Sequence, residues 1–279
     1  MPEKRFDVQA RFDVRGLTVV ITGGSGHFGR AMASALAQAG AQVAILGRHV
    51  EIAQTVATSI QAEGGSALGI ACDVLNRASL EHSQEQVTSA FGPVDILINA
   101  AGGNSPAATT STEQSFFDLD AEAVNHVFGL NFSGTFQSCQ VFGRGMAERG
   151  QGCILNITSM SGLRPLTRVP AYSAAKAAIV NFTQWLAVHM AQEYSPAIRV
   201  NALAPGFFLT EQNRYLMVDA HSGALTPRGQ TIIDHTPMGR LGAPEDLLGS
   251  LFWLVSPASA FVTGVVIPVD GGFSSFGGV

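Results

Sequence analysis

The feature that most restricts the fold of this chain is its alternation of short apolar runs with longer segments of helical periodicity. The apolar runs cover residues 17–22, 42–46, 67–72, 95–99, 153–157, 198–203 and 265–269. Helical patterns fall between them, over residues 29–39, 50–63, 129–148 and 171–192. Strands that are apolar along their whole length belong to parallel sheets covered by helices on both faces. We therefore predict an α/β fold built on a doubly wound parallel sheet.

No linker or change of composition divides the 279 residues, so we expect a single domain over residues 1–279. α/β folds of this length are routinely one domain. Residues 207–240 form the least regular region and are rich in Gly, Pro, Thr and polar side chains. Because ligands bind beyond the carboxyl ends of the strands in such a sheet, we expect this excursion to cover the substrate.

The composition argues against several classes of function. Charged residues make up 13% of the chain, the net charge is −5 and the arginines are scattered, so no nucleic-acid partner is expected. No run reaches the roughly 18 apolar residues of a membrane span, and no signal peptide is recognisable, so we predict a cytoplasmic protein without a membrane partner. The three cysteines, Cys72, Cys139 and Cys153, are far apart. Their spacing fits neither a disulfide framework nor a zinc site, and no metal is expected.

Glycines follow the first apolar run, where residues 24–29 read G-S-G-H-F-G. A pyrophosphate can approach the amides at a helix N-terminus only where the turn lacks side chains. The pattern alone also fits a tight turn that binds nothing. Between the first strand and the first helix, it favours dinucleotide binding on a Rossmann-type sheet.

The end of the second apolar run selects between the two nicotinamide dinucleotides. An NAD site usually has an acidic residue there, which binds the ribose 2′-hydroxyl. This chain has Gly47 and Arg48 instead, and a guanidinium suits a 2′-phosphate. We therefore expect NADP(H) to be favoured over NAD(H). Two alternatives remain: Arg48 is a plain surface residue, or Glu51 binds the ribose.

Polar and small residues follow the third and fourth apolar runs. Asp73 could accept a hydrogen bond from the adenine amino group, or could instead cap a helix. Asn99, Ala100 and Ala101 end the fourth run. Small residues at this position would let the backbone approach a cofactor closely.

Tyr172 and Lys176 lie four residues apart, on one face of an expected helix. Lys176 is one of only two lysines in a chain with fourteen arginines. A cation a few ångströms from a phenol is worth roughly 3–4 kcal/mol at an effective dielectric near 20. Such an interaction would lower the phenol pKa from its reference value towards neutrality. The pair could also be incidental, but it predicts a general acid/base.

Taken together, these motifs resemble the short-chain dehydrogenase/reductase family over almost the whole chain. The matching positions are Thr22-Gly23, residues 99–102, Asn131, Ser159, Tyr172, Lys176, Pro205-Gly206, Thr210 and residues 263–272. The resemblance implies that Tyr172 exchanges the proton, Ser159 binds the reacting oxygen, and Lys176 lowers the tyrosine pKa and holds the nicotinamide ribose. Asn131 would position a water in the proton path.

The resemblance also implies which residues bind the cofactor. They are Gly23, Ser25, Gly26, Phe28, Gly29, Arg48, Asp73, Val74, Asn99, Ala100, Ala101, Tyr172, Lys176, Pro205, Gly206, Phe208 and Thr210. One departure stands out: His27 takes the place of the family's middle glycine, and Gly26 comes one position earlier. The pyrophosphate turn is therefore expected to differ in shape.

Four segments are similar to the D-mannonate oxidoreductase (fructuronate reductase) branch of that family: residues 101–106, 162–168, 205–214 and 226–230. A sugar acid needs a cation for its carboxylate and polar partners for its hydroxyls. Candidate cations are Arg164, Arg168 and Arg214, and candidate hydroxyl partners are Asn104, Gln212, Asn213 and His235. Any one of them could instead be an ordinary surface residue.

The resulting prediction is hydride transfer between a nicotinamide and a keto or hydroxy sugar acid, with D-fructuronate and D-mannonate as the best specific guess. A keto-gluconate, a polyol or another small carbonyl compound is an alternative substrate. A non-catalytic dinucleotide-sensing protein is an alternative of another class. The resemblance further implies a homotetramer or homodimer assembled through the long helices.

Overall fold

A single seven-stranded parallel sheet forms the centre of the computed structural model, which describes residues 7–210, 214–219 and 222–278. The strands are β1 (Thr18–Thr22), β2 (Gln42–Gly47), β3 (Ser66–Ala71), β4 (Ile96–Asn99), β5 (Gly152–Ile157), β6 (Ile198–Pro205) and β7 (Val266–Val269). Their order across the sheet is β3-β2-β1-β4-β5-β6-β7, and every neighbouring pair is parallel. The predicted strands and doubly wound sheet are confirmed.

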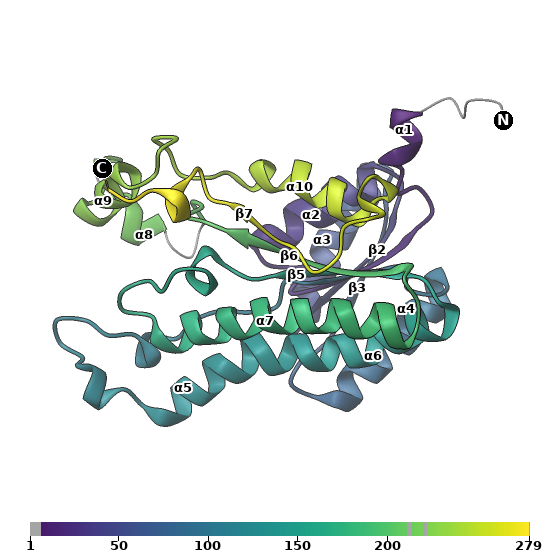
Figure 1. Ribbon diagram of the computed structural model, residues 1–279, viewed down its shortest axis with the longest axis horizontal. Coiled ribbons are helices and arrows are strands. Elements are labelled where there is room, and N and C mark those ends of the chain that lie inside the picture. The colour runs from purple at the N-terminus through teal and green to yellow at the C-terminus, as the bar shows by residue number, and fades with distance from the viewer. Residues whose placement is uncertain (1–6, 211–213, 220–221, 279) are drawn as a thin grey trace.

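Helices cover both faces of this sheet (Figure 1). The helices are α1 (Val8–Arg11), α2 (His27–Gln38), α3 (Val50–Ala62), α4 (Arg77–Phe91), α5 (Ala121–Phe128), α6 (Gly134–Arg149), α7 (Pro170–Glu193), α8 (Arg214–Met217), α9 (Pro227–Asp234) and α10 (Leu248–Val255). Side chains of α2, α3 and α10 share one apolar core, and those of α4, α6 and α7 share the other.

The unbroken apolar strands follow from this double cover. Along β1, Val19 and Ile21 face the α2 side, whereas Val20 faces the α7 side, and all three are fully buried. Successive strand residues point to opposite faces, so a sheet with a core on each side needs an apolar residue at every position.

One predicted helix differs in its extent. Instead of starting near residue 129, the helical segment starts with α5 and passes through a π-helical turn, Gly129–Ser133, before it continues as α6. Asp120 caps this earlier start, because its carboxylate accepts from the amides of Glu122 and Ala123. Inserted π turns of this kind occur frequently at functional sites, and this one contains Asn131.

The sheet has its topological switch between β1 and β4. The chain leaves β1 towards β2 on one side, whereas β4 leads on to β5 on the other. In such sheets the crevice for a ligand opens at the carboxyl ends of the two diverging strands. The glycine loop after β1 and the segments after β4, β5 and β6 meet at this edge. The excursion after β6 contains α8 and α9, and both lie beyond the carboxyl end of β6 (Figure 1).

Among the residues that the structure describes, no helix is both long and apolar enough to cross a membrane.

Candidate active site

Three of the predicted catalytic side chains lie together where β5 ends and α7 begins. Ser159 follows β5, and its hydroxyl accepts from the Ser161 amide at the start of a short 3-10 turn. Tyr172 lies beside Ser159, close enough for hydrogen bonding by the serine side chain to lower the tyrosine pKa. The Lys176 ammonium lies 5.5 Å from the centre of the Tyr172 ring. The i, i+4 spacing on α7 therefore places the phenol and the amine as neighbours, as the sequence predicts.

Lys176 is almost completely buried, with 4% of its surface exposed. Its ammonium donates to the Ile157 carbonyl at 2.9 Å, and the Thr158 hydroxyl donates to the Lys176 carbonyl at 2.8 Å. Burial of the cation lowers the pKa of Lys176 to about 8. These two hydrogen bonds fix α7 against the end of β5.

The protonation of Tyr172 differs from the sequence-based expectation. Its pKa is raised, because burial disfavours the charged phenolate, and the hydrogen bond with Ser159 only partly offsets that effect. The expected fall of this pKa towards neutrality is therefore wrong for this arrangement, because burial outweighs any stabilisation of the phenolate. The Lys176 ammonium donates to the Ile157 carbonyl, and its own burial weakens its hold on the proton. At neutral pH Tyr172 is therefore protonated.

Asn131 approaches the same group from the π turn. Its amide nitrogen donates to the carbonyls of Gly103 and Val127, each at 2.7 Å, and its oxygen accepts from the Gly103 amide at 3.3 Å. Gly102 lies between Asn131 and Lys176: a Cβ built on it would lie 2.5 Å from the Asn131 oxygen and 3.3 Å from the Lys176 ammonium. The loop after β4 therefore needs a residue without a side chain here.

The glycine loop fits the diphosphate of a dinucleotide. A Cβ on Gly29 would lie 2.4 Å from the Gly23 carbonyl oxygen, so the turn closes only with glycine. The first turn of α2 contains no acidic residue, and its N-cap residue, Gly26, makes no side-chain capping bond. The amides at this helix end thus remain available to an anion.

His27 is accommodated as the first residue of α2, with ordinary helical backbone, so the altered glycine pattern still closes the turn. Its ring nitrogen Nε2 is buried and has no hydrogen-bond partner among the described residues. Its ring packs edge-on against Phe28 at 5.7 Å, and Phe28 packs edge-on against Phe208 at 5.1 Å. These three rings connect the glycine loop to the segment that follows β6.

The end of β2 offers a surface suited to the adenosine ribose. A Cβ on Gly47 would lie 2.7 Å from the Ser25 hydroxyl, which brings the glycine loop against this strand end. Arg48 is exposed, and its guanidinium has no salt bridge within the described ranges. Ser25 and Arg48 therefore both border the end of β2.

The remaining predicted cofactor residues end or follow strands at the carboxyl edge of the sheet. Asp73 is exposed and accepts from the Leu75 amide at 3.0 Å, but it does not cap α4, because Asn76 does. The alternative of a capping role for Asp73 is therefore wrong. Buried Asn99 donates to Asn156 on the neighbouring strand at 2.9 Å. The other small or apolar residues lie at the ends of β3, β4 and β6: Val74, Ala100, Ala101, Pro205, Gly206, Phe208 and Thr210.

The predicted substrate residues are more dispersed than the predicted catalytic residues. Asn104 donates to the Thr109 hydroxyl at 2.9 Å, and a His235 ring nitrogen lies 2.8 Å from the Thr231 carbonyl. Arg164, Arg168 and Arg214 are exposed, and no hydrogen bond or salt bridge joins them to one another. Gln212 and Asn213 lie outside the described residues.

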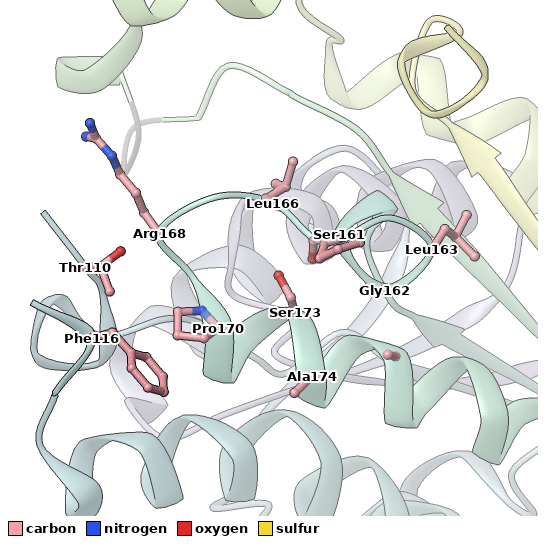
Figure 2. A pocket seen from close by; sticks show the side chains of 12 residues that line it. Thr110, Phe116, Ser161, Gly162, Leu163, Leu166, Arg168, Pro170, Ser173 and Ala174 are labelled. Atoms are coloured by element: carbon pink, nitrogen blue, oxygen red, sulfur yellow. The ribbon is translucent and has the colours of Figure 1, made fainter. Parts of the chain in front are cut away.

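The sequence did not indicate a cavity of about 480 Å³ beside the start of α7. Figure 2 shows Ser161 and Ser173 inside it, with Thr110, Phe116 and Arg168 on its far side. Both serine hydroxyls are buried and without a partner in the part of the chain that is described. The cavity follows the face of α7 that carries Ser173, Ala174 and Ala177, which differs from the face of Tyr172 and Lys176. No periodicity or motif could have revealed it, because distant loops close it.

Comparison with known proteins identifies the family of this chain. The family model described as short chain dehydrogenase matches residues 17–220. The chain belongs to the short-chain dehydrogenase family. The uncharacterized oxidoreductase UxuB of Bacillus subtilis is 50% identical to it, over 96% of this chain and 98% of that protein.

Two solved short-chain dehydrogenase structures are informative. A Haemophilus influenza protein provisionally named D-mannonate oxidoreductase, with bound NAD, superimposes with a TM-score of 0.91 at 43% identity, covering 98% of this chain and 100% of that one. A gluconate 5-dehydrogenase from Burkholderia cenocepacia, in complex with NADP and tartrate, has a TM-score of 0.86 at 31% identity, covering 97% and 100%. This chain is accordingly an oxidoreductase that uses a nicotinamide dinucleotide.

The position of Gly102 generates a first prediction. In Gly102→Ala the new methyl group must displace the Asn131 amide or the Lys176 ammonium, so we expect kcat/KM to fall about 100-fold or more. The melting temperature should change far less than the rate. Gly249→Ala is the matched control, because nothing lies within 4 Å of a Cβ there and the residue is helical. A Gly102→Ala enzyme with near-native rates would contradict the prediction.

The buried Lys176 generates a second prediction. Its pKa is about 8 in the folded protein against an ordinary value of 10.5. Between these values the unfolded chain binds more protons than the folded one, so the contribution of Lys176 to the unfolding free energy rises with pH. Below pH 8 the folded protein bears the full cost of the buried charge. Relative to Lys176→Met, the wild type should gain about 3 kcal/mol between pH 8 and 10.5.

Urea unfolding of the wild type and Lys176→Met at a series of pH values measures this difference, and effects of the other titrating groups largely cancel in it. Parallel stability curves for the two proteins would show that Lys176 keeps its proton throughout.

Proposed function

We propose that this enzyme transfers a hydride between the nicotinamide of NAD(P) and a keto or hydroxy sugar acid, with D-fructuronate and D-mannonate as the favoured pair. The chemistry rests on one observation: Tyr172 lies beside both Ser159 and the buried Lys176 ammonium. The choice of substrate is supported by the likeness to the Haemophilus influenza protein provisionally named D-mannonate oxidoreductase.

The bound nicotinamide supplies the hydride in reduction and accepts it in oxidation. In the reducing direction, the hydroxyls of Ser159 and Tyr172 donate hydrogen bonds to the substrate carbonyl oxygen. They stabilise the negative charge that develops there as the carbonyl carbon is reduced. Tyr172, which is protonated at neutral pH, then transfers its proton to that oxygen. The phenolate left behind is stabilised by the neighbouring Lys176 ammonium and regains a proton along the path next to Asn131.

In the proposed complex, amides of the glycine loop and the start of α2 bind the diphosphate, and Lys176 also holds the nicotinamide ribose. The segment with Phe208 and Thr210 borders the nicotinamide. The excursion over residues 207–240 covers the substrate. These roles agree with the position of each segment at the carboxyl edge of the sheet.

The runner-up substrate class is a keto-gluconate, favoured by the likeness to the gluconate 5-dehydrogenase; a polyol remains the further alternative. A non-catalytic dinucleotide-sensing protein is not supported, since Ser159, Tyr172 and Lys176 are all present and adjacent.

We further propose a homodimer or homotetramer in the cytoplasm. Exposed apolar side chains follow α6 and α7, including Phe136 at 37%, Trp185 at 55% and Val188 at 56%. Such a surface is typical of an interface between subunits. The three cysteines are free thiols, which suits a reducing compartment.

A substrate panel tests the proposed reaction. Initial rates are measured with hexuronates, aldonates, keto-gluconates and polyols, each with both nicotinamide dinucleotides. We expect the highest kcat/KM for the fructuronate/mannonate pair. Tyr172→Phe should lose nearly all turnover while its affinity for the reduced cofactor, measured by fluorescence titration, changes little. A panel in which polyols outperform every acid would refute the sugar-acid assignment, and rapid turnover by Tyr172→Phe would refute the catalytic one.

A separate prediction concerns the choice of cofactor. We propose that NADP(H) is favoured over NAD(H), because the Ser25 hydroxyl and the exposed Arg48 lie at the end of β2, where sheets of this kind bind the adenosine ribose. Arg48→Ala should weaken NADPH binding about 10-fold or more, as expected for loss of a charge-assisted hydrogen bond, and leave NADH binding nearly unchanged. Dissociation constants from nicotinamide fluorescence decide this. Equal affinity of the unmodified enzyme for both dinucleotides would count against it.

A further inference from the structure

Arg168 has an unusual backbone conformation. Its φ is +74°, and every other described residue with positive φ is a glycine. The left-handed region costs a residue with a Cβ roughly 1–2 kcal/mol. Such outliers occur where the surroundings enforce them, and they concentrate at functional sites. Arg168 lies two residues before α7 begins and four before Tyr172.

The surroundings of Arg168 explain how the strain is maintained. Its carbonyl accepts a hydrogen bond from the Thr110 amide at 2.9 Å. Thr110 belongs to the loop that follows β4, and Arg168 belongs to the loop that follows β5. The left-handed residue therefore joins the two loops that border the carboxyl edge of the sheet, where the substrate must lie to reach Tyr172.

The side chain of Arg168 is held ready but without a partner. It is exposed, and no hydrogen bond or salt bridge to its guanidinium occurs in the described ranges. In Figure 2 it extends away from Ser161 and Ser173 and stands clear of the other labelled side chains. Arg15, Arg77 and Arg240, by contrast, each pair with an acidic side chain.

From this geometry we infer that Arg168 binds the carboxylate of the substrate and selects acids over neutral sugars. This inference rests on the proposed function and names the specificity residue among the three candidate cations. A planar guanidinium can hold a carboxylate through two parallel hydrogen bonds. The acid end of a sugar acid is remote from its reacting carbonyl, so a cation in the loop four residues before Tyr172, at the border of the site, suits it. On this inference, the strained backbone is retained because it presents the Arg168 side chain to the substrate.

The decisive variant is Arg168→Gly, because glycine accepts positive φ without a Cβ penalty and keeps the Thr110 contact. We expect its melting temperature to stay equal to or rise above that of the wild type. The KM for the best sugar acid should rise about 10-fold or more, the range for loss of hydrogen bonds to a charged group, with kcat little changed. The inhibition constant of a neutral polyol of equal chain length should remain the same.

Three further variants sharpen the test. Arg168→Lys keeps the charge without the planar fork, so its KM should fall between those of the wild type and Arg168→Gly. Arg144→Ala removes an exposed arginine from α6, away from both loops, and its KM should match the wild type. Arg164→Ala tests the rival candidate in the same loop, and its KM should rise less than that of Arg168→Gly.

Three results would overturn the assignment of Arg168. The first is an unchanged KM for the sugar acid in Arg168→Gly. The second is that, in Arg168→Gly, the KM of the acid and the inhibition constant of the neutral polyol rise by the same factor. The third is a larger rise of the acid KM in Arg164→Ala than in Arg168→Gly. A wild type that turns over neutral substrates but no sugar acid would instead refute the proposed function itself, and the Arg168 assignment with it. These outcomes are distinguishable, because only the last one is seen in the unmodified enzyme.

Discussion

The buried ammonium of Lys176 is the constraint on which the rest of the site depends. A cation removed from water must find a partner, and here the partner is the Ile157 carbonyl at the end of β5. This bond fixes the rotation of α7 and so places Tyr172 over the edge of the sheet.

Two glycines pack against the same lysine. A Cβ on Gly162 would lie 2.7 Å from the backbone carbonyl of Lys176, and Gly102 passes close to its ammonium. The loops after β4 and β5 thus converge on one residue. A strained residue, Arg168, joins those loops a few residues before Tyr172. The site is therefore rigid at the phenol and strained at its border, a combination that suits the proposed proton donor, Tyr172, and the proposed specificity residue, Arg168.

Much of the fold could be predicted from the sequence. The strands were recognisable because a sheet covered on both faces requires apolar residues without interruption. Two helices had no clear pattern: α4 buries only Leu80, Ser83 and Val87, and α10 is too short and too uniformly apolar to distinguish from a strand. The sequence pattern did not predict the π turn either, although Asp120 is a recognisable N-cap residue for the earlier helix start.

For the candidate site, the sequence alone determined which side chains are the candidates for the chemistry. Helix geometry places Tyr172 and Lys176 on one face because they are four residues apart. Chain connectivity places the glycines between β1 and α2, at the helix N-terminus. Only the tertiary structure decided the direction of the Tyr172 pKa, which depends on burial against charge. It also decided which candidate arginine is strained and held between two loops. Burial and backbone strain arise from residues distant along the chain, and local spacing contains no information about either.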